Sequence, residues 1–456
     1  MKKLFITLSI LLTSAVSFAQ VSNVMYSSTL VPQAGALNPA FFPKNTSIYI
    51  ALPGINPQLQ SPLSFNDIFQ YDAAAQQTNI NLNNLVSSLA EDGNINLDLN
   101  VHGAGLGLKL GRGQLSLAAQ VKANMHLGIP SGLMTFLNEG NYSHRGEKLE
   151  LVDGSLLNVQ AYSELSVAYG RELIDGLTVG ARVKILNGLL SANTAGSSLA
   201  LTTAEDLSSI QATLATRVQY SSFLDSNLHF NPNNLITNNW GFGFDLGAHY
   251  EMGILEFSAS ILDLGKGITW NDNVKNIIPK NNEEGVFVFE GIDLTSLITN
   301  GSIDSNLAHT LTDSLSSLLQ YETVDGQSFT TKVPTKVNAA VMVHPIAPLR
   351  AGVMFHGEMD RYTNAEDAFT KLRSNTTLLG NLNLNDWVEL MVSASIVGDG
   401  DHVSWFNPGF GINLSLARTF QVYGMVDYIS NLRLVEAKSL NLAVGINLLL
   451  GNGSKK

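Results

Sequence analysis

The residues best suited to bind a metal ion form one short segment, Asp399-Gly400-Asp401-His402. Carboxylates two residues apart can supply oxygen ligands to Ca²⁺. A calcium loop of the EF-hand type needs further oxygen ligands and a distal glutamate, and these are missing here. The spacing therefore favours a solvated polar loop, and we expect no resident metal and no cofactor.

The sequence carries no recognisable catalytic constellation. It lacks the Gly-x-Ser-x-Gly nucleophile elbow, the His-Glu-x-x-His zinc helix and the phosphate-binding loop. The glycine-rich segments 103–107 and 241–243 lie inside alternating segments, which favours strand glycines that leave room for a plug or a ligand. Because there are no cysteines, thiolate metal sites, cysteine nucleophiles, disulfides and a lipoprotein anchor are excluded. We expect that the protein is not an enzyme.

Charged side chains recur on one face of segments whose other face is apolar. On the lipid face of a membrane barrel, Lys or Arg would cost about 2–4 kcal/mol at the midplane, so their shared phase predicts that they face the lumen. The members are Lys109, Lys122, Glu164, Arg182, Lys184, Asp245, Glu256, Lys336, Arg350, Glu358 and Glu389. Two roles are open for them: a lattice of salt bridges, which is favoured, or a substrate-selecting surface. The same face carries histidines that we expect to form hydrogen bonds rather than bind metal, namely His126, His249, His344 and His356.

These segments alternate with a period of two, which is typical of strands. Between Leu115 and Leu127 the odd positions are apolar and the even positions are mostly polar. Such segments pair into six hairpins with short turns: 95–110 with 115–127, 159–169 with 177–185, 240–250 with 255–261, 337–343 with 349–355, 376–384 with 388–396, and 410–416 with 420–428. A first strand at 48–52 and a last at 440–448 bring the sum to about 14, an even number that closes an antiparallel barrel. The phase shifts near Gly103, which predicts a bulge.

The connections between hairpins are long, at 53–94, 129–157, 190–239 and 266–335. Transmembrane barrels of the outer membrane have short periplasmic turns and long outer loops, so we place these segments outside. Segment 190–239 could hide one more hairpin, which would give about 16 strands. Helical spacing at Leu307, Leu311 and Leu315, and again at Leu82, Val86 and Leu89, predicts short helices in these loops.

Composition and the N-terminus point to export. Charged residues make up 14% of the chain, against about 25% in an average soluble domain. The net charge of -12 argues against nucleic acid as a partner. Lys2 and Lys3, the apolar run 4–16 and the small residues before position 20 predict a signal peptide over 1–19. The apolar run is too short to span a bilayer stably as a helix, which takes about 20 residues.

A resemblance to a known family begins at Leu37-Asn38-Pro39-Ala40-Phe41. An Asn-Pro-Ala motif soon after the mature start resembles the long-chain fatty-acid transporter superfamily of outer-membrane barrels, and more closely an uncharacterised branch of it. Asp263-Leu264-Gly265 followed by Trp270 resembles a second motif of that branch. The resemblance implies an all-β, antiparallel transmembrane barrel of about 14 strands, with an N-terminal hatch over 20–45 that contains Asn38, Pro39 and Ala40. An ordinary turn is the alternative for this motif, since Asn-Pro often starts one.

The expected organisation is therefore a signal peptide, a hatch, a barrel over 46–450 with the outer insertion 266–335, and a periplasmic tail over 451–456. The expected location is the outer membrane of a Gram-negative bacterium, in contact with lipid. The expected function is passive transport of a hydrophobic or amphipathic small molecule. The alternative is a structural or accessory barrel that binds a protein partner through its outer loops, as part of a secretion or surface-anchoring complex.

Overall fold

The computed structural model describes most of the mature chain. The described residues are 23–72, 77–80, 86–89, 93–153, 156–194, 197–206, 210–215, 217–223, 236–280, 286–289, 321–359, 372–384, 387–399, 402–427, 429 and 436–451. The expected signal peptide, the Leu307–Leu315 helix and two residues of the Asp399–His402 segment lie outside these ranges.

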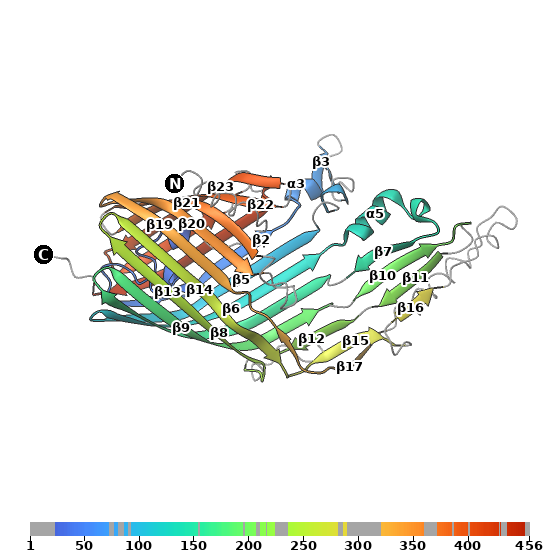
Figure 1. The fold of residues 1–456 in the computed structure, drawn as a ribbon, viewed down its shortest axis with the longest axis horizontal. Coiled ribbons are helices and arrows are strands. Elements are labelled where there is room, and N and C mark those ends of the chain that lie inside the picture. Colours follow the sequence, from blue (N-terminus) through green and yellow to red (C-terminus); the bar gives the residue numbers. More distant parts are fainter. Residues whose placement is uncertain are drawn as a thin grey trace, which may run out of the picture.

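A closed antiparallel barrel of 14 strands forms the body of the molecule (Figure 1). Its first strand has two pieces, β1 (Ile48–Ala51) and β2 (Gly54–Gln60), and these pair with both β5 and β25 to close the ring. The others, in order around the ring, are β5 (Asn94–Leu110), β6 (Gly113–Gly128), β8 (Leu157–Ile174), β9 (Leu177–Asn193), β13 (Trp240–Met252), β14 (Leu255–Trp270), β19 (Lys336–Ile346), β20 (Leu349–Met359), β21 (Leu372–Leu384), β22 (Val388–Asp399), β23 (His402–Leu416), β24 (Phe420–Asp427) and β25 (Ser439–Leu450).

This architecture confirms the fold expected from the alternating pattern, with all six hairpins and the two terminal strands. Along β8, residues from Gln160 to Gly170 alternate between buried and more exposed positions. The exposed set is apolar, as Leu165 and Val167 show. Such a band can face hydrocarbon while the ladder satisfies every backbone polar group. The predicted bulge is also confirmed, because the register of β5 against β6 shifts between His102 and Gly105.

Several strands are longer than the apolar pattern predicts. β9 was expected to end at 185 and ends at Asn193, and β14 was expected to end at 261 and ends at Trp270. The added residues continue the backbone ladder beyond the part of the strand where one face must be apolar. The alternating pattern therefore shows only the part of each strand that lies in lipid, whereas the hydrogen-bonded ladder continues beyond it.

Beyond the long-loop end of the barrel, extra strands extend the wall (Figure 1). β12 (Val218–Ser222), β15 (Lys275–Pro279) and β17 (Tyr321–Asp325) continue from β9, and β18 (Phe329–Thr331) pairs with β14. A separate 4-stranded sheet contains β7 (Lys148–Asp153), β10 (Ser198–Thr203), β11 (Ile210–Ala215) and β16 (Val286–Phe289). The described residues of segment 190–239 that follow β9 therefore form outer strands rather than a barrel hairpin.

Short helices lie at the same end, as the loop spacing predicted for 86–89. α3 (Phe65–Ile68) begins with a capping box between Ser64 and Asp67. It is followed by the hairpin of β3 (Phe69–Asp72) and β4 (Gln77–Ile80). α5 (Ser131–Glu139) precedes the turn η2 (Tyr142–His144), and a small apolar cluster with Leu89 and Met134 joins the loops. No helix in the described ranges is long and apolar enough to cross a membrane.

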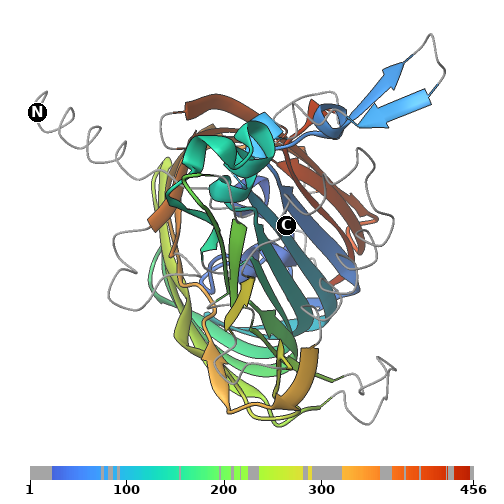
Figure 2. The same cartoon turned by 90° about the vertical axis from the view of Figure 1, so that its right-hand side faces the viewer.

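Residues 23–44 fold inside the barrel, and we call this segment the plug. It contains α2 (Asn23–Tyr26) and η1 (Pro32–Ala36). Its hydrogen-bond partners lie on strands around the whole ring, from β6 and β9 to β20, β22 and β25. Seen from the long-loop end, its dark blue ribbon lies within the ring of strands (Figure 2). Its apolar side chains, including Val24, Met25 and Val31, form two clusters with the inner face of β19 to β25.

Candidate functional site

The Asn-Pro-Ala motif of the plug forms a turn that is also bound to the wall. Asn38 Oδ1 accepts from the Ala40 amide at 2.9 Å, and the Phe41 amide donates to the Asn38 carbonyl at 2.9 Å. The Asn38 side-chain amide donates to the carbonyls of Ala248 and Ala259, at 3.1 and 3.2 Å. The motif thus forms a turn, and the Asn38 side chain also attaches it to β13 and β14 by hydrogen bonds.

Two glycines of the wall make room for this turn. A Cβ on Gly247 would lie 2.1 Å from Asn38 Oδ1, and a Cβ on Gly180 would lie 2.3 Å from the Pro39 carbonyl oxygen. Real Cβ atoms do not approach so closely, so only glycine allows the plug backbone this near the strands. Neither position stood out in the sequence, because each is a single glycine inside a strand.

Glu389 anchors the other side of the plug with neutral donors. This fully buried carboxylate accepts from the Ser28 hydroxyl at 2.7 Å and from the Thr29 amide at 2.9 Å. Asn381 on β21 donates to it at 2.8 Å, and Asn413 on β23 at 3.5 Å. A buried carboxylate is costly unless such donors satisfy it, so this carboxylate ties the plug to three neighbouring strands.

Five of the predicted charged residues meet in one group on the long-loop side of the plug, which we describe as above it. Lys122 pairs with Glu164 at 2.7 Å, and Arg182 pairs with Asp245 at 3.1 Å. Lys184 contacts Asp245 at 2.8 Å and Asp263 at 2.6 Å. We call these residues, with Asp263, the ionic cluster. Arg182 also donates to the plug carbonyls of Gly35 and Ala36, so the cluster holds the plug from above.

Asp263 is a member that the pattern did not identify. It belongs to the Asp-Leu-Gly motif, and its backbone has a positive φ of 59°. Its amide donates to Asp245, and its carboxylate accepts from Lys184. The register of β13 against β14 shifts in this region, so Asp263 leaves the regular alternation on which the prediction depended. The sequence offered one indication of this role: Asp263 is a charged residue in a motif that interrupts the alternating pattern.

A second charged group lies below the plug, near the short turns. Glu256 accepts from Arg350, whose Nε is 3.0 Å away, and from His344 Nδ1 at 2.9 Å. Arg350 also donates to the plug carbonyl of Ser27, at 2.6 Å. The plug residue Lys44 pairs with Glu251 at 3.2 Å. This group therefore fastens both ends of the plug to β13, β14 and β20.

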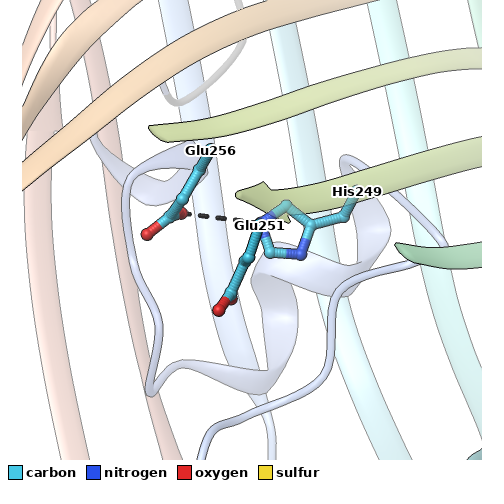
Figure 3. A group of neighbouring side chains, drawn as sticks. All are labelled: His249, Glu251 and Glu256. Atoms are coloured by element: carbon cyan, nitrogen blue, oxygen red, sulfur yellow. Dashed lines mark ion pairs between the residues drawn. The ribbon is translucent and has the colours of Figure 1, made fainter. Parts of the chain in front are cut away.

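Within this lower group, His249, Glu251 and Glu256 point toward one another beside the plug (Figure 3). Their ligand atoms lie within 4.8 Å of one another, which is close enough for a shared cation. Arg350 and Lys44 already neutralise both carboxylates, so a divalent ion would meet an electrically balanced group. We therefore assign these residues to ion pairing.

Two further predicted residues lie beside these groups, since Lys336 lines a cavity with the ionic cluster and Lys109 lines a cavity with the lower group. Lys336 is 3.9 Å from Glu358, on the neighbouring strands β19 and β20. Lys109 lines the mouth at the short-turn end. The histidines form hydrogen bonds: His126 with Asn96 at 2.8 Å, and His356 with Asn338.

An apolar cluster covers the inner side of β8, β9 and β14 on the long-loop side of the ionic cluster. Trp270 is fully buried with Ile268 and Leu186, and its indole donates to Thr331 at 2.8 Å. Gly188 makes room for it, since a Cβ there would lie 2.6 Å from the indole ring. The surroundings of the inner face of β9 therefore change along the strand. Gly180 contacts the plug, Arg182 and Lys184 belong to the ionic cluster, and Leu186 and Gly188 contact the apolar cluster.

Several cavities of the described chain adjoin the plug, among them the three that follow. The ionic cavity, about 120 Å³, lies above the plug and is lined by Lys122, Glu164, Lys184 and Asp263. The wall cavity, about 60 Å³, lies between the plug and strands β1, β5, β6 and β8. The short-turn cavity, about 260 Å³, lies below the plug beside Lys44, Lys109 and Glu256.

The wall cavity reaches an interruption of the barrel. β1 pairs with β5 up to Ala51 and Gly105, and β2 resumes at Gly54 and His102. The residues between them, 52–53 and 103–104, have no Cα partner across this ladder. The cavity is lined by plug residues and also by Ala104 and Leu117, which share the phase of the lipid face. It therefore extends from the plug into the wall itself.

The fold and its interior define the class of protein: a transmembrane β-barrel whose lumen holds its own N-terminal segment. A family model described as "Family of unknown function (DUF5723)" matches residues 39–427, and the chain belongs to this family. This agrees with the uncharacterised family that the motifs indicated. The comparison with curated proteins finds no match.

Solved structures to which this chain is similar include proteins from two pseudomonads. The Pseudomonas putida toluene transporter TodX is 8% identical with a TM-score of 0.40, over 95% of this chain and 93% of that chain. A Pseudomonas aeruginosa FadL homologue is 10% identical with a TM-score of 0.45, over 95% of this chain and 99% of that chain. The substrates in these names belong to those proteins.

Proposed function

We propose that this protein is an outer-membrane barrel that lets a hydrophobic or amphipathic small molecule cross passively, with an amphipathic cargo fitting the interior better. One observation carries the proposal: a strongly polar cavity adjoins a cavity that enters the wall. The ionic and wall cavities share the lining residues Gln33, Ala36, His102, Gln120 and Arg182.

The two cavities differ in chemistry in the way an amphiphile requires. The ionic cavity offers ammonium and carboxylate groups to a polar head. The wall cavity offers small and apolar groups to a chain, at Ala51, Ala104 and Leu117. A molecule with its head in the first and its chain in the second would point its chain toward the bilayer. Burying that chain would stabilise the complex by about 0.8 kcal/mol per methylene.

Movement of side chains must accompany transport. A water molecule needs about 10–15 Å³ of cavity volume. The wall cavity, at about 60 Å³, therefore holds only a few waters. A larger molecule must therefore widen it, and the wall beside the cavity lacks Cα partners at 52–53 and 103–104 across the ladder of β1 and β2 with β5.

A blocking substitution tests this route. Ala104→Phe would cover the wall cavity from the lipid side with an apolar ring, which lipid tolerates. The matched control is Ala394→Phe, which places the same ring on the lipid face of β22, away from the cavity. In liposomes, influx of a fluorescent carboxylate amphiphile should fall several-fold in the first variant and stay unchanged in the control.

Equal influx in both variants would contradict the wall route. No influx through the wild-type barrel, for any amphiphile or hydrophobic probe, would sink the transport proposal itself. Mass spectrometry of molecules that co-purify with gently extracted protein would then be the next measurement.

A second candidate function is an accessory barrel for a secretion or anchoring complex. The observation that favours it is the strand-rich extension beyond the barrel, including the 4-stranded sheet of β7, β10, β11 and β16. Transport alone does not require this extension. A stoichiometric protein in the same co-purification would support this reading.

A further inference from the structure

The three cavities form a series along one side of the plug. The wall cavity shares lining residues with the ionic cavity above it and also with the short-turn cavity below it. Inner-face residues of β6 show the same order, from Gln114 through Ala118 to Lys122. A molecule in the wall cavity therefore has two neighbouring spaces besides the bilayer.

The boundary between the wall cavity and the short-turn cavity involves few residues. The residues shared by the wall cavity and the short-turn cavity are Phe41, Phe42 and Gln114. Gln114 is held in place, because its amide donates to the plug carbonyl of Ala40 at 3.0 Å. Among the described residues, these three are the ones that line both cavities.

The two phenylalanines are held very differently. Phe41 packs against both apolar clusters of the plug and lies edge-on to Tyr26 and His249, at 5.1 and 5.4 Å between ring centroids. Phe42 has one aromatic neighbour, Tyr49, at 5.5 Å and a tilt of 49°. Phe42 lines both the wall cavity and the short-turn cavity, and neither apolar cluster of the plug includes it.

We propose that the Phe42 ring is a gate between the wall cavity and the short-turn cavity. When the gate is closed, as here, the wall cavity leads only toward the bilayer and the ionic cavity. Rotation of the ring opens a second exit to the short-turn mouth while Asn38 and Glu389 keep the plug in place. The gate rests on the proposed function for its cargo, but its existence can be tested without cargo.

The absence of cysteine from the natural chain allows a clean test. Ala118→Cys places a single thiol in the wall cavity, at a residue that forms no side-chain hydrogen bond. The full chain is reconstituted in liposomes, and a small cationic methanethiosulfonate is added outside. Only molecules whose long loops are protected from added protease are scored by mass spectrometry, so the reagent arrives from the short-turn side.

Opening the gate should speed labelling of this thiol. Phe42→Ala should raise the rate about tenfold, which corresponds to losing about 1.4 kcal/mol of preference for the closed state. Phe42→Trp should lower the rate below that of wild type. Phe69→Ala is the matched control, since this ring packs on Phe65 at the opposite end of the molecule, and it should leave the rate unchanged.

Two outcomes would overturn the gate. One is the same rate in all three Phe42 forms of a folded barrel. The other is labelling of Val31→Cys in the Phe42→Ala background, because Val31 is buried in the plug core and would react only if the whole plug had moved. Faster labelling without any amphiphile influx would preserve the gate and reject the proposed function, so the two failures are distinguishable.

Discussion

At the scale of single residues, the interior depends on buried charges that satisfy one another. Lys184 is 3% exposed and lies between the carboxylates of Asp245 and Asp263, which are buried as well. Taking one charge out of such a group leaves the others uncompensated in a medium of low polarity. These residues therefore hold the wall and the plug together only as a set.

Removing the central cation should destabilise the barrel strongly. Lys184→Met should lower the free energy of unfolding by about 3–5 kcal/mol, because the buried Asp263 carboxylate loses its ion pair and Asp245 keeps only its pair with Arg182. The measurement is urea unfolding in lipid vesicles, followed by tryptophan fluorescence. The matched control is Lys148→Met, which breaks the exposed pair with Glu150 and should cost less than about 1 kcal/mol. Equal losses in the two variants would argue against the ionic cluster as a structural centre.

The sequence predicted these residues as a set but not their partners. The alternation alone tells which side chains face the lumen and which face the lipid, since a strand has only two faces. Which lysine meets which carboxylate depends on register between strands that are distant in the chain, as for Lys184 and Asp263. The neutral hydrogen bonds of Glu389 with Ser28 and Thr29 also needed the fold, because the plug and β22 are far apart in sequence.

At the scale of elements, the number and pairing of strands followed from the alternating pattern, and their lengths did not. Lipid forces one face of a strand to be apolar, and outside the bilayer that constraint ends. The outer sheets lack such a pattern, so segment 190–239 remained ambiguous between loop and hairpin. The bulge at Gly103 was visible because it reverses the phase of an otherwise regular strand.

One short turn holds avoidable strain. Between β23 and β24, Ala417 and Arg418 adopt positive φ values of 51° and 56°. The left-handed conformation costs a non-glycine residue about 1–2 kcal/mol, and Asn-Gly is the pair that tolerates it best. The double substitution Ala417→Asn, Arg418→Gly should therefore stabilise the barrel by about 1 kcal/mol in the same unfolding assay. Arg418→Lys, which keeps a side chain at the strained position, should change nothing, and a gain there would contradict the explanation.

At the scale of the whole molecule, we expect the plug to decide whether the barrel conducts ions. Residues 23–44 contact strands on every side of the ring, and the inner wall behind them is polar. A chain lacking 23–44 should therefore form ion-conducting pores in a planar bilayer, while the full chain stays silent. A silent deletion variant would contradict this and would place the closure at the Trp270 cluster instead.

The closure of the ring has a consequence for the order of events in assembly. The strand that carries the interruption, β1 with β2, pairs with β25 from the opposite end of the chain. Joining segments so far apart in sequence is the costliest loop closure in the fold, so it is expected to come late. The plug directly precedes β1 and is enclosed on all sides once β25 arrives. We therefore expect it to fold into place while the ring is still open, and the interrupted stretch of the wall lies next to the last seam to form.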